Sequence, residues 1–101
     1  MSMSKNDFFN KNTEIRIQPT VHYAIIDDVI VVASFRDMYY YFLDETSTEF
    51  FRTIMHCEKK LYGCILESLL PKFEEEVKSV IIKDFTEWCY HMRDKNILKI
   101  T

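Results

Sequence analysis

The spacing of apolar residues changes near the middle of the chain. Before that point, three short apolar runs are separated by pairs of charged residues: VHYAII (Val21–Ile26), VIVVASF (Val29–Phe35) and MYYYFL (Met38–Leu43). Such runs, rich in β-branched and aromatic residues, are typical of strands, and Asp27-Asp28 and Arg36-Asp37 suit two-residue turns. We therefore expect a three-stranded antiparallel meander, preceded by extended chain from Ile15.

After Leu43 the apolar residues recur at helical spacing. A first helix is expected to begin at Thr46, which has the capping-box spacing to Glu49, with Asp44 as the alternative cap. Its apolar face consists of Phe50, Phe51, Ile54 and Met55. A second helix is expected over Leu61–Leu70, because Pro71 disfavours its continuation.

A third helix is expected after the acidic residues 74–76, whose charge suits a helix N-terminus. Its predicted core face consists of Val77, Ile81, Phe85, Trp88 and Met92. It should end near Asn96, a residue type that tolerates the left-handed conformation of a helix C-terminus. Residues 97–100 are then expected to pack back on the core. The predicted order is β-β-β-α-α-α, which is an α+β fold.

Size and composition fit one domain. The chain has 101 residues, of which 48% are hydrophobic, enough for one core. Residues 1–14 are polar and are expected to be flexible, so the domain is predicted to span residues 15–101. The net charge of −3 argues against nucleic-acid binding. No apolar run approaches the ~20 residues that span a bilayer, and no signal peptide is visible, so we expect a cytoplasmic protein without membrane partners.

The residues that usually carry chemistry form no recognisable motif. The three cysteines are odd in number and include no CxxC, which favours free thiols. The set His56, Cys57, Cys64 and His91 does not have zinc-site spacing, so no metal is expected. The single glycine excludes a Gly-rich phosphate loop. No Ser-His-Asp or Cys-His signature occurs, and we expect neither catalytic activity nor a cofactor.

The run MYYYFL raises the question of what covers it. The third strand of a meander has one open edge, and this run lacks the Lys, Pro or bulge that usually protects such an edge. Alternation places Tyr39, Tyr41 and Leu43 on the expected core face, and Met38, Tyr40 and Phe42 on the other. The edge either receives an extended peptide, or is covered by the N-terminal segment or by a second copy of the chain.

Two longer stretches resemble the PqqD-like family, the leader-recognition elements of ribosomally made, modified peptides. VHYAIIDDVIVVASFRDMYYYFLDETSTEFF (21–51) resembles the family's acidic turn, hydrophobic strand and YY-x-L-N-E-T, with Asp44 in place of Asn. IIKDFTEWCYHMRDKNIL (81–98) resembles D-V-x-x-F-L-x-x-L-x-x-x-G-L-L, with Asn96 in place of Gly. The resemblance covers about Glu14 to Ile100. One departure is Lys60, where the family often has a capping Thr at the start of the second helix.

This resemblance implies a winged-helix-like, non-catalytic domain that binds the leader of a precursor peptide. The leader would add as a strand to the third strand, beside the third helix, and be presented to a modifying enzyme. That enzyme is a leader-cleaving cysteine protease in lasso-peptide systems and a radical-SAM enzyme in others. The residues expected to bind the peptide are Met38, Tyr39, Tyr40, Tyr41, Phe42, Lys78, Ile82, Phe85 and Cys89.

Alternatives remain open for several of these residues. Ile82, Phe85 and Cys89 also suit plain core packing, and Trp88 is assigned to the core, with a peptide anchor as the alternative. Basic residues of the third helix (Lys78, Lys83 and Arg93) are candidates to pair with acidic leader residues. The alternative function is a winged-helix DNA-binding regulator. Against it, all strands precede the helices, and the third helix carries Asp84, Glu87 and Asp94.

Overall fold

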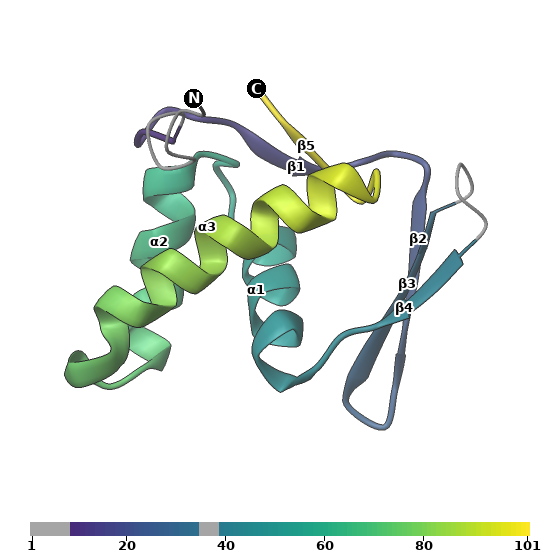
Figure 1. Cartoon of the computed structure of the whole chain (residues 1–101), viewed down its shortest axis with the longest axis horizontal. Helices are drawn as coiled ribbons and strands as arrows, with labels where there is room; N and C mark the ends of the chain where they lie inside the picture. Colours follow the sequence, from purple (N-terminus) through teal and green to yellow (C-terminus); the bar gives the residue numbers. More distant parts are fainter. Residues whose placement is uncertain (1–8, 35–38) are drawn as a thin grey trace, which may run out of the picture.

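The computed structural model describes residues 9–34 and 39–101. A three-stranded sheet stands on one side of the helices, and α3 crosses over α1 and α2 (Figure 1). The elements are β1 (Ile15–Ile17), β2 (Val21–Ile26), β3 (Val29–Ser34), β4 (Tyr39–Phe42), α1 (Glu45–His56), α2 (Tyr62–Leu69), two 3-10 turns η2 (Leu70–Lys72) and η3 (Glu75–Val77), α3 (Lys78–Asp94) and β5 (Leu98–Ile100).

The meander is confirmed, with strand order β2-β3-β4 and antiparallel pairing throughout. Ile26 pairs with Val29 across the first turn, so Asp27 and Asp28 form a two-residue loop. Both aspartates have positive φ, 51° and 66°, which is the conformation of a type I′ turn. This turn matches the right-handed twist of the two strands it joins, and Asp tolerates its strained backbone better than most residues do.

The first helix begins at the alternative cap, Asp44, and the prediction of Thr46 as the cap is wrong because Thr46 lies inside α1. Asp44 is extended, and its Oδ1 accepts a hydrogen bond from the Ser47 N–H at 2.7 Å. At the other end, the Lys60 ammonium donates to three backbone carbonyls, those of Ile54, Met55 and Cys57. Lys60 therefore closes α1 instead of capping α2, which accounts for its departure from the family pattern.

The second helix starts without a side-chain cap because the N-terminal segment supplies acceptors. The Tyr62 N–H donates to the Thr13 carbonyl at 2.8 Å, and the Gly63 N–H to the Lys11 carbonyl at 3.1 Å. Phe9 packs on the rings of Tyr62 and Tyr90. Ordered packing in the described chain thus begins before Ile15, and residues 9–14 lie against α2 and α3. Whether residues 1–8 are flexible lies outside the described residues.

A second, two-stranded sheet joins the two ends of the domain. Ile15 pairs with Ile100 and Ile17 with Leu98. Asn96, with φ of 62°, ends α3 and turns the chain back, as expected. Residues 97–100 therefore do pack back on the core. Their strand partner β1 was not identified from the sequence.

The core is filled from both sheets and all three helices. Phe50 of α1 contacts the rings of both Phe85 and Trp88 of α3, and Tyr62 of α2 stacks on Phe85. The prediction that Val77 belongs to this core is wrong, since Val77 is exposed. The reason is that residues 75–77 form the separate turn η3, so Val77 does not follow the phase of α3.

Candidate functional site

The open edge of β4 is the first element of the candidate site. β4 pairs with β3 on one side, and no other strand of the described chain lies beside it. The Leu43 N–H donates to the Ile30 carbonyl at 2.9 Å, which sets the alternation of the ladder. The backbone groups of Tyr41 therefore point toward β3, and those of Tyr40 and Phe42 point toward the open side.

Tyr40 and Phe42 also expose their side chains. They are 74% and 75% exposed, whereas Leu43 is buried and Tyr41 is half-buried, so the predicted alternation of faces is confirmed for residues 40–43. Tyr40 pairs with Ala33 and Phe42 with Val31 on the outer face of the sheet. A shallow apolar hollow of about 240 Å³ lies on this side, with Tyr40, Val31 and Ala33 among its lining residues. Exposed apolar surface of this kind commonly marks an interaction site.

The second element is a cleft between the start of α1 and α3, called here the α1–α3 cleft. Its volume is about 350 Å³, and it is lined by Asp44, Thr46, Ser47, Phe50, Asp84, Glu87, Trp88 and His91. Asp84, Trp88, His91 and Lys95 follow one another along α3 at helical spacing. The Lys95 ammonium lies 4.8 Å from the centre of the Tyr41 ring. This stripe of α3 therefore meets β4 at Lys95 and lines the cleft at Trp88.

The cleft is acidic at its rim and aromatic inside. Asp84 and Glu87 form no ion pair with any residue of the described ranges. Trp88 is 8% exposed, and its indole N–H has no hydrogen-bond acceptor among those residues. A buried donor without an acceptor costs free energy, so a group that could accept from it would be stabilised here.

The predicted residues on α3 lie elsewhere. Phe85 and Cys89 are fully buried and face the core, so core packing, the alternative left open by the sequence, describes these two residues. Burial raises the pKa of the Cys89 thiol well above its ordinary value. Ile82 is half-buried, and Lys78 forms an ion pair with Glu75 at 3.2 Å. Their suggested contact with a peptide stays a prediction.

Two of the predicted strand residues lie wholly or partly outside the described residues. Met38 lies outside the described residues, and of Tyr39 the structure describes the backbone position in β4.

Arg93, suggested as a partner for acidic groups, lies over the Tyr90 ring and 3.5 Å from Asp94. Its charge is therefore already partly compensated.

Sequence reasoning missed the α3 residues that line the cleft. They are Asp84, Glu87, Trp88 and His91, with Lys95 beyond them. Trp88 was correctly assigned to the core, but it also lines the cleft. The signal in the sequence was the helical spacing of residues 84, 88, 91 and 95. These residues form a line about 100° around the helix from the predicted line of residues 78, 82, 85 and 89. Both lines contain apolar residues, because α3 packs on α1 and α2 together.

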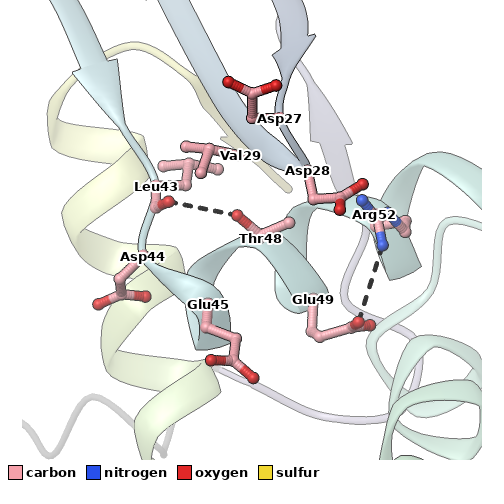
Figure 2. A pocket seen from close by; sticks show the side chains of 9 residues that line it. All are labelled: Asp27, Asp28, Val29, Leu43, Asp44, Glu45, Thr48, Glu49 and Arg52. Carbon is pink, nitrogen blue, oxygen red and sulfur yellow. Dashed lines mark hydrogen bonds and ion pairs between the residues drawn. The ribbon is translucent and has the colours of Figure 1, made fainter.

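A second acidic hollow lies on the far side of Asp44, between the β2–β3 turn and α1 (Figure 2). Its volume is about 430 Å³, and its lining includes Asp27, Asp28 and Glu45. Two interactions tie it together: the Thr48 hydroxyl donates to the Leu43 carbonyl at 3.3 Å, and Arg52 pairs with Glu49 at 3.8 Å. The first of these holds the end of β4 on α1, next to the α1–α3 cleft.

Residues 9–34 and 39–101 contain neither a candidate metal site nor a candidate membrane span. No group of three or more His, Cys, Asp or Glu side chains there is arranged to hold a metal ion. None of the helices described has the length and apolar character required to cross a membrane.

The sequence matches no family model and no curated protein. Among solved structures, the fold is similar to that of TbiB1 in complex with the TbiA(beta) leader peptide, with a TM-score of 0.72 and 17% sequence identity. The match covers 83% of this chain and 94% of that chain. This protein therefore has the winged-helix-like α+β fold expected from the resemblance, and it shares that fold with a protein solved with a leader peptide bound.

Proposed function

We propose that this protein binds the leader of a ribosomally synthesised precursor peptide by strand addition to β4, and that it has no catalytic activity of its own. The observation that carries the proposal is the open edge of β4, where the backbone groups of Tyr40 and Phe42 have no partner strand in the described chain. Fold similarity alone does not license a function. Here it is supported by a local feature suited to the same task.

Tyr40 and Phe42 offer one backbone donor and one acceptor each, so a leader strand gains about four hydrogen bonds. At about 0.5–1.5 kcal/mol net for each bond, the edge contributes about 2–6 kcal/mol before the cost of ordering the peptide. That range does not reach micromolar affinity by itself. Side-chain contacts must add to it, and the surfaces suited to them are the exposed rings of Tyr40 and Phe42 and the α1–α3 cleft, which Asp44 borders two residues beyond Phe42.

The proposed role includes presenting the leader to a maturation enzyme, such as a cysteine protease or a radical-SAM enzyme. The outer face of the sheet supports this role, because Ile26, Tyr40 and Phe42 expose apolar surface there. A leader paired with β4 would extend the same face and leave it open to an enzyme. The DNA-binding alternative gains no support, since the accessible face of α3 presents Asp84 and Glu87 where a recognition helix needs basic groups.

The test is fluorescence anisotropy with labelled peptides encoded by short reading frames beside this gene. One or more should bind saturably. Two versions of each binder, N-methylated at alternate residues, then test strand addition without altering the protein. One version loses the N–H groups that face β4 and should bind at least about tenfold more weakly, whereas the other should bind like the parent peptide. Absence of any saturable binding, or equal effects of the two versions, would refute the proposal.

A further inference from the structure

The α1–α3 cleft holds more negative charge than its surroundings neutralise. Three carboxylates line it, those of Asp44, Asp84 and Glu87. The Asp44 carboxylate accepts the Ser47 N–H, but neither Asp84 nor Glu87 has a cationic partner in the described part of the chain. Arg93 and Lys95 are engaged elsewhere, Arg93 at Tyr90 and Asp94, and Lys95 at Tyr41. Lys83, which precedes Asp84, is exposed and forms no ion pair with a described residue.

Trp88 supplies an independent observation. It lines the cleft while being more than nine-tenths buried, and its indole N–H lacks an acceptor among residues 9–34 and 39–101. Phe50 lies beside it, with the ring centres 5.4 Å apart. The cleft thus combines aromatic surface, an unused hydrogen-bond donor and unpaired carboxylates.

We propose that the α1–α3 cleft receives a positively charged side chain, Arg or Lys, of the bound peptide. An aromatic ring attracts a cation through its π face, and carboxylates at the rim add direct charge pairing. The Trp88 indole N–H is itself almost fully covered, so a peptide carbonyl reaches it only if side chains at the cleft move. The identity of the ligand as a leader rests on the proposed function. The expected charge is opposite to that suggested by the basic residues Lys78, Lys83 and Arg93 in the sequence.

The position of the cleft relative to β4 restricts where the basic residue lies. Asp44 is two residues beyond Phe42, which corresponds to about 7 Å along an extended chain. A leader antiparallel to β4 would run past Asp44 before it reaches Phe42 and Tyr40. The basic residue is therefore expected within about one to three residues on the N-terminal side of the leader segment that pairs with Phe42.

The test uses N-acetyl-arginine amide as the probe and N-acetyl-citrulline amide as its uncharged isostere. The chain has a single tryptophan, so one indole N–H signal in a ¹H–¹⁵N NMR spectrum reports on the cleft. Each probe is titrated to about 100 mM at constant ionic strength, a range that captures weak binding. N-acetyl-lysine amide, tested in parallel, shows which cation the cleft prefers.

We expect the arginine probe to shift the Trp88 indole signal saturably and the citrulline probe not to do so. Asp84→Asn combined with Glu87→Gln should reduce the initial slope of this shift at least about fivefold, because both carboxylates are exposed and their loss leaves the core intact. Glu58→Gln combined with Glu67→Gln removes the same charge at exposed residues outside the cleft, and should leave the slope unchanged.

Equal shifts with arginine and citrulline, or no shift with either cation, would overturn the inference. This result is distinguishable from failure of the proposed function. If no leader binds but the arginine probe does, the cleft is a cation site and leader recognition is wrong. If a leader binds but the arginine and lysine probes do not, leader recognition stands and the charge assignment is wrong.

Discussion

Backbone N–H groups along β4 point alternately to β3 and to the open side, which allows a test of strand addition on the protein itself. Phe42 directs its N–H to the open side, and Tyr41 directs its N–H to β3. Phe42→Pro therefore removes a donor that only an added strand would use, at a site where proline is tolerated because the donor faces outward. Tyr41→Pro removes a hydrogen bond inside the sheet. The two substitutions are chemically similar, adjacent in sequence and opposite in expected effect.

The magnitudes follow from the contacts of the two residues. Phe42→Pro removes one backbone hydrogen bond to the leader and leaves the leader carbonyl that accepted it without a partner. This loss weakens binding by about 1–3 kcal/mol, or about 5- to 150-fold in Kd. The Phe42 side chain is largely exposed, so the free energy of unfolding should change little. Tyr41→Pro loses a ladder bond, half-buried ring surface and the contact with Lys95, and should destabilise the fold by about 3 kcal/mol or more.

The assays are leader anisotropy for binding and urea unfolding for stability. Phe42→Ala is the matched control, because it removes the same ring and keeps the N–H. The reasoning requires Phe42→Pro to bind more weakly than Phe42→Ala while both fold. If the two variants bind equally well, the Phe42 N–H does not pair with the leader and strand addition at this register is refuted.

Three further predictions concern the supports of the site. Lys60→Met should lower the free energy of unfolding by about 2 kcal/mol, since three carbonyls at the end of α1 lose a charged donor. Lys59→Met is the exposed control, and equal urea midpoints for the two variants would show that the Lys60 contacts contribute nothing. Gly63→Ala should destabilise by about 1–2 kcal/mol in spite of its better helix propensity, because its Cβ would lie 2.8 Å from Lys11 Cβ; a gain in thermal stability would contradict this. Burial raises the pKa of the Cys89 thiol, so this thiol ionises at lower pH in the unfolded chain than in the folded one. The free energy of unfolding should therefore be retained below the ordinary thiol pKa of 9.0 and fall as the pH rises above it. Cys89→Ala should flatten that alkaline decline in urea midpoints measured from pH 7 to 10, and an unchanged slope would contradict the assignment.

The sheet and the approximate extent of the helices were predictable because their determinants are local. Alternation along 38–43 and the two-residue Asp27-Asp28 turn specify the meander, and Asp44 supplies a cap within its own segment. The edge residues Tyr40 and Phe42 were identified for the same reason. A strand at the end of a meander has an open side whatever packs around it.

The α3 side of the site was not predictable in the same way. A helix that packs on two neighbours has a wide apolar surface, so the sequence does not show which line of residues faces the core and which borders the cleft. The structure turns Phe85 and Cys89 inward and leaves Asp84, Glu87 and Trp88 at the cleft.

The amino-acid sequence alone thus determined the order of the meander strands and the three helices, the turn chemistry, and which residues of β4 face the open edge. All of these depend on residues within a few positions of one another. Tertiary structure decided what lies far apart in sequence. It paired β1 with β5, placed residues 11–13 over the start of α2, and brought Asp44 to the same cleft as Trp88. These contacts depend on the rotation and crossing of whole helices, which the packing of all core side chains sets together.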